Sequence, residues 1–432
     1  FTGFRKLRLE NRWLKAGYAG AALKVVITIV NIVIGSVLER EKIYVSYVWK
    51  VIVFCGGILP IVLMGCFYFG MRAELKKQNV NINHEVLLHI LIWYVVVVAL
   101  AAWNYQGLIL ALIILAAYIG ILVELKHIAE KLEEAGYILE EQTVRISNGK
   151  CVGCAVVLTV AGLFSAYLFL DSYHMEWTMV KESQDPVSEE IKDHLLSLGL
   201  PEDILNDLTE EDLLECKNAR QVFVERDDYP MNDGVKVVSG TEGYTQYSTE
   251  YPQKELKLSG AAIELEQKGQ WKVIHHFRWN EDPGFRGTES LQIYPVYSGQ
   301  KSGWTVNGGL TGQVLYEKNG TSYTADYAVL QNENYNTRDG FPFYDMMEHS
   351  SIFAEFSMPR HGENCRGYVA YEIKEKENDW WIDSWLNYTH QNTLVQYPVL
   401  SVAQSRKQGG VMDRRVFTTV QNALQVLPGE SN

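Results

Sequence analysis

The first 170 residues carry runs of apolar side chains that are too long for a strand or a short core helix. A run of 21 uncharged residues lies between Lys50 and Arg72, and residues 151–170 form another of 20. A third run of 38 lies between Glu85 and Glu124 and is interrupted by polar residues at 104–107. Because a bilayer core about 30 Å thick requires ~20 apolar residues of helix, these runs predict membrane spans. The interruption predicts a tight turn between two of them.

A weaker apolar run from Ala16 to Leu38 contains one charge, Lys24. We expect its long side chain to reach the near interface. The pattern therefore predicts a helical membrane bundle over 1–170 with five spans, at about 16–38, 50–71, 86–103, 107–123 and 151–170.

The placement of Lys and Arg predicts an orientation. With five spans, twelve basic residues fall on one side: Arg5, Lys6, Arg8, Arg12, Lys15, Arg72, Lys76, Lys77, Lys126, Lys131, Arg145 and Lys150. The other side has Arg40, Lys42, Lys50 and Lys181. Since positive loops stay in the cytoplasm, we expect a cytoplasmic N-terminus and an extracytoplasmic chain after about residue 172. Because residue 1 is Phe, we expect the native chain to begin further upstream.

The loop at 124–150 is too polar to span a membrane. Its apolar residues follow a 3-4-3-4 spacing: Leu125, Ile128, Leu132, Ala135 and Leu139. That spacing is typical of a short coiled-coil seam. Two interpretations stay open, a continuation of the fourth span that packs on its own chain, and a seam that forms a homo-oligomer.

Residues 171–219 read as a linker followed by a small helical collar. Asp185 can cap a helix that begins at Pro186, and Thr209 can cap another before Leu213. The apolar positions lie on one side of these helices and acidic residues on the other. We interpret the collar as packing between the membrane part and the outer domain, with a protein-docking element as the alternative.

From residue 220 the pattern changes to alternating apolar and polar positions, which predicts strands. The predicted strands are 256–265, 271–279, 291–297, 352–358, 366–374 and 380–389. Asn319-Gly320 predicts a hairpin turn. The fold class is thus a membrane bundle followed by an α+β domain over 220–432, dominated by an antiparallel β-sandwich or jelly-roll-like sheet. Val416, Val420, Leu424 and Leu427 predict a closing helix at 411–427.

The net charge of the chain changes sign near residue 170, where the long apolar runs end. Residues 1–170 contain 16 Lys and Arg against 11 Asp and Glu, a net charge of +5. The remaining residues contain 23 against 41, a net charge of −18. The acidic second part argues against nucleic acid as a partner. Because no Asp or Glu lies in a predicted span, the sequence also argues against a proton-coupled transporter.

Histidine and cysteine give no metal motif. His275 and His276 are adjacent in a predicted strand and therefore point to opposite faces, His275 into the core and His276 outward. Cys151 and Cys154 lack a second pair for zinc, and we expect no metal and no cofactor. Cys216 and Cys365 are the only cysteines of the outer part, and a disulfide between them is one interpretation.

The last predicted hairpin is rich in aromatic residues. Trp380, Ile382, Leu386 and Tyr388 form an apolar face. Trp381, Asp383, Trp385 and Asn387 share the other face, which is typical of surfaces on which sugar rings stack. We favour burial of both faces in a core, and keep these four residues, with His276, as candidate ligand-binding residues.

Several stretches resemble an uncharacterised family of bacterial multi-pass membrane proteins with an extracytoplasmic β-rich domain. They are LGLPEDILNDLTEEDLLECKNA, HHFRWNEDPGFRGTESLQIYP, GLTGQVLYEKNG, and FSMPRHGENCRGYVAYEI followed by DSWLNYTHQ, within about 185–400. Residues 1–80, two predicted spans followed by RAELKKQN, are similar to the membrane end of a domain of unknown function that accompanies PadR-type regulators. Neither resemblance supplies functional residues.

We therefore expect a non-enzymatic protein of the bacterial envelope, a sensor or accessory subunit. Its outer domain would bind a peptide, a glycan or a partner membrane protein. Two alternatives stay open. One is an extracytoplasmic glycan hydrolase that uses carboxylates near the aromatic hairpin, with Glu281 and Asp282 as an example of a carboxylate pair. The other is a component of a membrane exporter.

Overall fold

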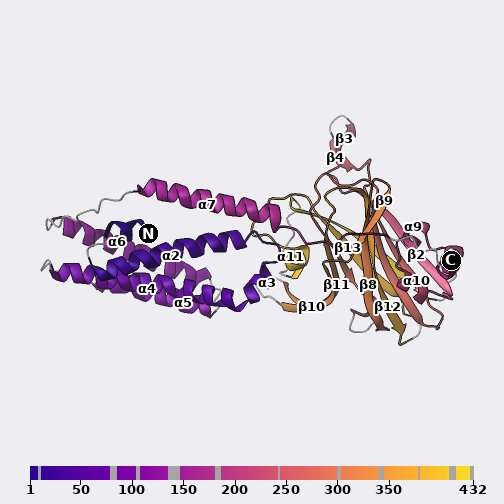
Figure 1. Ribbon diagram of the computed structural model, residues 1–432, viewed down its shortest axis with the longest axis horizontal. Helices are drawn as coiled ribbons and strands as arrows, with labels where there is room; N and C mark the ends of the chain where they lie inside the picture. Colours follow the sequence, from indigo (N-terminus) through magenta and orange to yellow (C-terminus); the bar gives the residue numbers. More distant parts are fainter. Residues whose placement is uncertain are drawn as a thin grey trace. The chain divides into compact units, whose positions relative to one another are not determined.

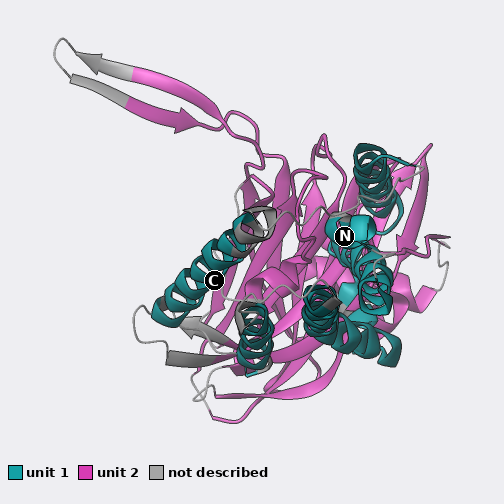
Figure 2. Cartoon of the chain, turned by 90° about the vertical axis from the view of Figure 1, so that its left-hand side faces the viewer, with its two compact units in different colours: residues 1–170 teal, residues 171–432 magenta. Residues whose placement is uncertain are grey.

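The computed structural model describes residues 1–7, 11–77, 85–103, 108–134, 146–180, 186–241, 244–298, 303–339, 345–377, 380–407 and 415–428. The chain divides into two compact units, Phe1–Leu170 and Asp171–Asn432 (Figure 2). The first is helical and the second consists mostly of strands (Figure 1). This boundary agrees with the change of pattern and charge in the sequence.

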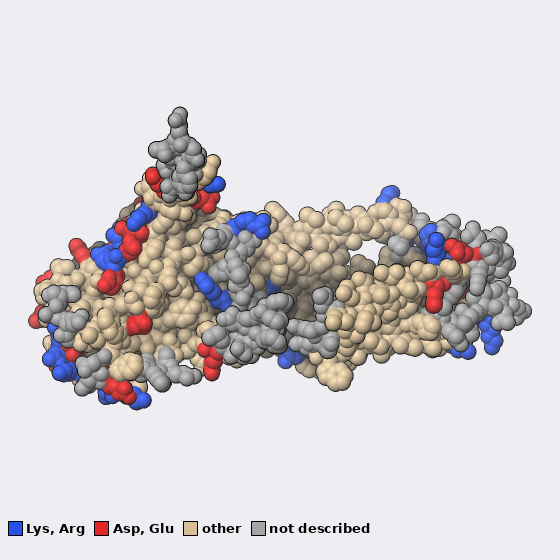
Figure 3. All heavy atoms as spheres, turned by 180° about the vertical axis from the view of Figure 1, so that it is seen from behind, with Lys and Arg blue, Asp and Glu red and all other residues tan. Residues whose placement is uncertain are grey.

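The helical unit contains seven described helices. They are α1 (Thr2–Leu7), α2 (Arg12–Ile34), α3 (Arg40–Val45), α4 (Tyr47–Lys77), α5 (Glu85–Ala102), α6 (Leu108–Glu134) and α7 (Asn148–Phe169). Four of them, α2, α4, α6 and α7, are long and apolar enough to cross a membrane. The apolar part of α5 is shorter, Leu87–Ala101. On the face shown in Figure 3, long stretches of this unit carry no charged side chain.

The sequence located these helices well, but not their ends. Helix α6 continues past the predicted span to Glu134, which agrees with the interpretation that the helix of the fourth span continues into 124–150. Leu132 of the predicted seam therefore lies in the helix, whereas Ala135 and Leu139 lie outside the described residues. The predicted turn at 104–107 also lies outside them.

Lys24 has a more specific role than reaching the interface. Pro60 lies inside α4 and has no N–H to donate to the carbonyl of Gly56, four residues earlier. Lys24 of α2 donates to that carbonyl at 3.0 Å. The charged side chain thus replaces the missing backbone donor and links the two helices.

The second unit contains two large antiparallel sheets and a ribbon. The seven-stranded sheet has the order β1-β9-β8-β12-β6-β5-β2, the five-stranded sheet β10-β11-β7-β13-β14, and the ribbon β3-β4. The strands are β1 (Thr178–Met179), β2 (Gln221–Tyr229), β3 (Val235–Thr241), β4 (Tyr244–Glu250), β5 (Leu256–Glu264), β6 (Gln270–Trp279), β7 (Thr288–Tyr294), β8 (Trp304–Lys318), β9 (Thr321–Ala325), β10 (Val329–Asp339), β11 (Asp345–Ser357), β12 (Glu363–Glu375), β13 (Ile382–Gln391) and β14 (Phe417–Val426). Two short elements accompany them, η1 (Val296–Ser298) and α11 (Val402–Lys407).

Both sheets contribute to one hydrophobic cluster. It contains Trp271, Val273 and Phe277 of β6 together with Leu386 and Tyr388 of β13. These are the apolar positions of two alternating patterns, so the alternation predicted the core face correctly. The prediction of a mostly antiparallel β domain after the helices is confirmed.

The other face of the seven-stranded sheet is covered by three short helices, which we call the helical cover. They are α8 (Pro186–Ser197), α9 (Glu202–Leu205) and α10 (Glu210–Glu215). A second hydrophobic cluster joins Ile191 and Leu195 of the cover to Ile263 and Ile274 of the sheet. The predicted collar therefore packs on the sheet of its own unit. Helix α8 begins at Pro186 as predicted, and the predicted cap Asp185 lies outside the described residues.

Local turn signals were reliable. The β8–β9 hairpin turns at Asn319 and Gly320, with φ of 53° and 74°. Positive φ at both central residues is what this two-residue turn requires. Thr209 caps α10, since its Oγ1 accepts from the N–H of Asp212 at 3.2 Å.

The predicted closing helix at 411–427 is wrong. Residues 408–414 lie outside the described residues, and Phe417–Val426 form β14, paired with β13. Val420 and Leu424 are four residues apart, a spacing that fits one side of a helix and equally one face of a strand. The Thr418-Thr419-Val420 run of β-branched residues favours the strand.

Candidate functional site

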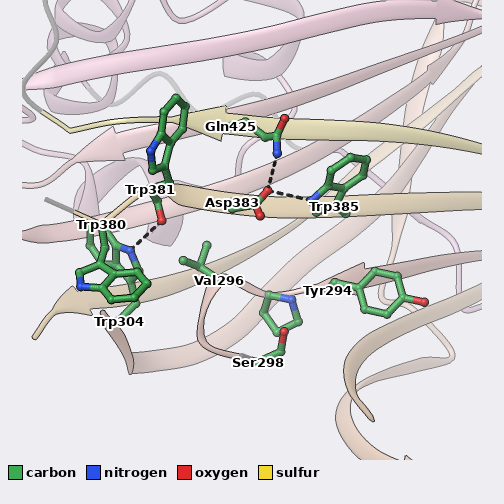
Figure 4. A pocket seen from close by; sticks show the side chains of 10 residues that line it. Tyr294, Val296, Ser298, Trp304, Trp380, Trp381, Asp383, Trp385 and Gln425 are labelled. Atoms are coloured by element: carbon green, nitrogen blue, oxygen red, sulfur yellow. Dashed lines mark hydrogen bonds between the residues drawn. The ribbon is translucent and has the colours of Figure 1, made fainter. Parts of the chain in front are cut away.

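A hollow of about 540 Å³ lies where β13 begins and β7 ends. We call it the tryptophan hollow. Among the described residues it is lined by Tyr294, Pro295, Val296, Ser298, Trp304, Trp380, Trp381, Asp383, Trp385 and Gln425 (Figure 4). Its volume is in the range of small-ligand sites, about 300–1,000 Å³. Aromatic rings with a few polar groups are the usual lining of such sites.

The two faces of β13 have different environments. Ile382, Leu386 and Tyr388 are fully buried in the core between the sheets, as predicted. On the opposite face, Trp381 is 53% exposed and Asp383 is also exposed. Our interpretation of both faces as core is therefore wrong at Trp381 and Asp383, whereas Trp385 is half-buried and Asn387 is buried on the same face. It is also wrong for Trp380, which is 39% exposed and lines the hollow.

Asp383 is held in place within the hollow. Its Oδ1 accepts hydrogen bonds from the indole Nε1 of Trp385 at 2.8 Å and from Nε2 of Gln425 at 3.0 Å (Figure 4). Both donors use the same oxygen. The carboxylate is thus oriented by two neighbours, while Oδ2 points toward the hollow on the side of Val296 (Figure 4).

Two further tryptophans shape the hollow from the neighbouring segments. Trp304, at the start of β8, is buried and donates from Nε1 to the carbonyl of Trp381 at 3.0 Å. Trp380 donates from Nε1 to Glu377 at 3.2 Å. A Cβ on Gly303 would lie 2.2 Å from the Trp380 ring, so only glycine permits this close approach.

Polar groups in the core hold the floor of the hollow. Ser384 Oγ donates to the carbonyl of Tyr294 at 3.3 Å and accepts from the Tyr371 hydroxyl at 2.9 Å. Tyr371 also accepts from the N–H of Val296 at 3.3 Å. His275 Nε2 lies 2.8 Å from the same Ser384 oxygen, and burial lowers the pKa of His275 to about 3. His275 is therefore a neutral core histidine, as predicted.

Two candidate ligand-binding residues lie outside the hollow. Asn387 is 6% exposed and is held by amide contacts, donating to Gln292 at 3.4 Å and accepting from Gln421 at 2.9 Å. His276 lies on the other sheet and is fully buried. Its prediction as an outward-facing ligand residue is wrong, because the helical cover lies over that face and Asp207 accepts its hydrogen bond at 2.8 Å.

The helical cover is anchored by buried charges that sequence reasoning missed. Asp212 accepts from Lys272 at 2.6 Å, from Thr311 at 2.7 Å and from Tyr368. Burial favours the neutral acid, but Lys272, Tyr368 and Thr311 outweigh it and lower the pKa of Asp212. Lys272 lies on the polar side of the alternating pattern of 271–279, where an exposed lysine is expected, so the pattern carried no signal of its burial.

Asp207 makes the second anchor. Besides His276, its carboxylate accepts from Nε of Arg366 at 2.8 Å. Burial is again the largest effect, yet the hydrogen bond and charge of His276, together with Arg366, lower the pKa of Asp207. The acidic side of the predicted collar thus points in part toward the sheet.

Cys216 and Cys365 are free thiols, and the disulfide interpretation is wrong. Cys216 belongs to the cluster between the cover and the sheet, whereas Cys365 belongs to the cluster between the two sheets. The seven-stranded sheet therefore separates them. Burial raises the pKa of Cys216 to about 12 and raises that of Cys365 as well.

A second, more polar hollow of about 480 Å³ contains four carboxylates, Glu281, Asp282, Glu317 and Glu363. Two of them are in ion pairs, Asp282 with Arg286 at 3.2 Å and Glu317 with Arg366 at 3.0 Å. Within the described part of the chain, no group of three or more His, Cys, Asp or Glu side chains is placed to hold a metal ion.

Comparisons with known proteins add little. No protein-family model matches the chain, and no curated protein matches it. Among solved structures, one titled "Pore forming protein" is similar at 7% identity and a TM-score of 0.16, covering 39% of this chain and 78% of that one. The KRT10-binding region domain of the pneumococcal serine-rich repeat protein PsrP is similar at 12% identity and a TM-score of 0.14, covering 39% and 86%. Likeness at these TM-scores carries no argument about this chain.

Proposed function

We propose that this chain is a non-enzymatic membrane protein of the bacterial envelope that binds a glycan in the tryptophan hollow. The observation that carries the proposal is the exposed indole of Trp381 beside a carboxylate already oriented by Trp385 and Gln425. The C–H groups of a sugar ring pack on an aromatic face, and its hydroxyls bond to fixed polar groups.

The membrane arrangement is part of the same proposal. Five passes, with α5 as the shortest, bring the twelve basic residues counted above to the cytoplasmic side. The domain after residue 172, in which the two sheets act as a β-sandwich, then lies outside the cell. Single cysteines introduced at exposed positions of the β unit, such as Asp326→Cys, test the orientation in a background without the native cysteines. Labelling of intact cells by an impermeant maleimide supports it, and labelling only after lysis overturns it.

Binding fits the hollow better than hydrolysis. Glycoside hydrolysis uses two carboxyl groups about 5–9.5 Å apart, and Asp383 is the one carboxylate among the described lining residues. Its Oδ1 is taken by two donors. The polar hollow around Asp282 supports the alternative of a hydrolase. Turnover of peptidoglycan glycan strands by the full chain, abolished by Asp282→Asn and retained in Asp383→Asn, would favour that alternative.

The direct test uses the full chain in a polyoxyethylene detergent, whose head group contains no sugar. Chitotetraose, its deacetylated form, cellotetraose and peptidoglycan glycan strands are titrated by calorimetry against the wild type and Trp381→Ala. Tyr247→Ala is the matched control, since Tyr247 is an exposed aromatic residue on β4. We expect the wild type to bind at least one glycan. Trp381→Ala should bind it about tenfold more weakly, because it loses a stacking contact of ~1.4 kcal/mol. No binding, or equal binding by Trp381→Ala, overturns the proposal.

A further inference from the structure

We propose that the glycan of the tryptophan hollow carries a positively charged amino group, and that Asp383 recognises it. This inference rests on the proposed function and names the class of ligand, an amino sugar with a free ammonium group. It follows from the charges that line the hollow, from the unused oxygen of Asp383, and from the aromatic faces around it.

The hollow has a negative charge and no described positive one. Its described lining contains one carboxylate and no Lys, Arg or His. A second carboxylate, Glu377, lies at its margin and accepts from Trp380. The residues after 170 carry a net charge of −18. One cation outside the lining, Arg406, acts on the hydroxyl of Tyr294. The attraction for a cation therefore comes from Asp383 and from the net negative charge of the surrounding unit.

Asp383 has one oxygen to offer a ligand. Trp385 and Gln425 donate to Oδ1, and Oδ2 points into the hollow (Figure 4). A neutral hydroxyl could bond to that oxygen, but a charge-assisted hydrogen bond from an ammonium group is roughly twice as strong. Because Trp385 and Gln425 already fix the carboxylate, binding requires no reorientation of the side chain.

The aromatic rings favour the same ligand. Trp381, directly before β13, and Trp385 of β13 lie on either side of Asp383 (Figure 4). Trp385 presents the N–H edge of its ring to the carboxylate, so Trp381 is the ring whose face can take part. The face of an indole ring attracts cations, and tryptophan does so more strongly than the other aromatic residues. A sugar ring stacked on Trp381 with an ammonium substituent near Asp383 would use both interactions. A neutral sugar would use only the stacking.

The experiment compares two tetrasaccharides that differ in charge. Chitotetraose has acetylated, neutral amino groups, and its deacetylated form has free amines. Both are titrated against the full chain in polyoxyethylene detergent at about pH 5.5, where amines are protonated and free carboxylic acids are ionised. Spermine serves as a polycation without sugar rings.

We expect the deacetylated tetramer to bind about tenfold more tightly than chitotetraose, and spermine to bind weakly. Asp383→Asn should remove this preference, since Asn keeps an oxygen for Trp385 and Gln425 but loses the charge. Asp326→Asn, which neutralises an exposed carboxylate elsewhere on the unit, should retain it. Raising the salt concentration from about 0.05 M to about 0.5 M should weaken binding of the deacetylated tetramer and leave binding of chitotetraose unchanged.

The outcomes separate this inference from the proposed function. Equal binding of both tetramers, or a preference that survives Asp383→Asn, overturns the amino-sugar inference and leaves glycan binding intact. Spermine bound as tightly as the deacetylated tetramer also overturns it. If neither these tetramers nor the other glycans of the direct test bind, the proposed function itself fails.

Discussion

The ammonium group of Lys24 donates a hydrogen bond of 3.0 Å to the carbonyl oxygen of Gly56. In a regular helix that oxygen accepts from the N–H four residues later, and Pro60, which occupies that position, has none. A charge in an apolar helix and a proline in another are both unfavourable alone. Each is accommodated here by the other.

This relationship predicts a coupling between the two positions. Lys24→Met should destabilise the helical unit more in the presence of Pro60 than in a Pro60→Ala background, by about 0.5–2 kcal/mol. In that background alanine restores the backbone N–H that donates to the carbonyl of Gly56. Thermal unfolding of the four proteins of the cycle in detergent measures the coupling, with Lys15→Met as the control for loss of a charge. Additive effects would contradict the role assigned to Lys24.

Two tryptophans of the hollow should respond differently to truncation. Trp304 is 3% exposed and belongs to the core, so Trp304→Ala should lower the free energy of unfolding by about 3–5 kcal/mol. Trp381 is 53% exposed, and Trp381→Ala should change it by less than ~0.5 kcal/mol while weakening glycan binding. Thermal unfolding followed by fluorescence distinguishes them. A large loss of stability in Trp381→Ala would show that its ring belongs to the core.

The buried pair of Lys272 and Asp212 predicts a strong effect of removing one partner. Lys272→Met leaves the carboxylate of Asp212 buried without its cation and should destabilise the β unit by about 3–5 kcal/mol. Adding Asp212→Asn should recover part of that loss, because the uncompensated charge is removed. Denaturant unfolding of the single and double variants measures both steps. A double variant less stable than Lys272→Met would contradict this account.

Asp207 and Asp212 predict acid sensitivity. Both have pKa values below the ordinary value in the folded state. A carboxyl group with a lowered folded pKa stabilises the fold above its unfolded pKa of about 3.9, and this contribution is lost as the pH falls through the folded pKa. The melting temperature should therefore fall below about pH 4. At neutral pH Asp207→Asn should be less stable than the wild type, and on acidification its melting temperature should fall by less. An equal fall in the two proteins would exclude Asp207 as a cause of the acid sensitivity.

The thiols of Cys216 and Cys365 should be unreactive in the folded protein. Both are buried, and burial raises both pKa values, so little thiolate is present at neutral pH. Alkylation without reductant should spare both in native conditions and modify both in denaturant, as read by peptide mass spectrometry. A disulfide-linked peptide pair under denaturing, non-reducing conditions would contradict their separation by the sheet.

Patterns that depend on local chemistry could be predicted from the sequence. The apolar runs predicted the long helices, Asn319-Gly320 predicted its hairpin, and the alternation of residues 271–279 predicted β6. The ends of helices and the identity of β14 could not be predicted in this way. A spacing of four residues is shared by helices and strands, and the pairing of β14 with β13 decided between them.

The solvent exposure of the candidate site residues could not be predicted from the sequence, for a different reason. Alternation showed that Trp381, Asp383 and Trp385 share a face, but whether that face meets solvent depends on what the rest of the chain places over it. Trp381 is exposed to solvent, because the described chain places no element over it. His276 is buried, because the helical cover lies over its face of the seven-stranded sheet. Asp207 and Asp212 look like ordinary surface acids in the sequence, because their partners Arg366 and Lys272 come much later in the chain.

The position of β12 has a consequence for how the domain assembles. β12 lies between β8 and β6, so it joins two groups of strands that are made earlier in the chain. Until residue 375 has been synthesised, both groups expose a bare edge that could pair with another chain. β12 thus closes the sheet, and a chaperone that shields those two edges would act before Glu363–Glu375 emerge.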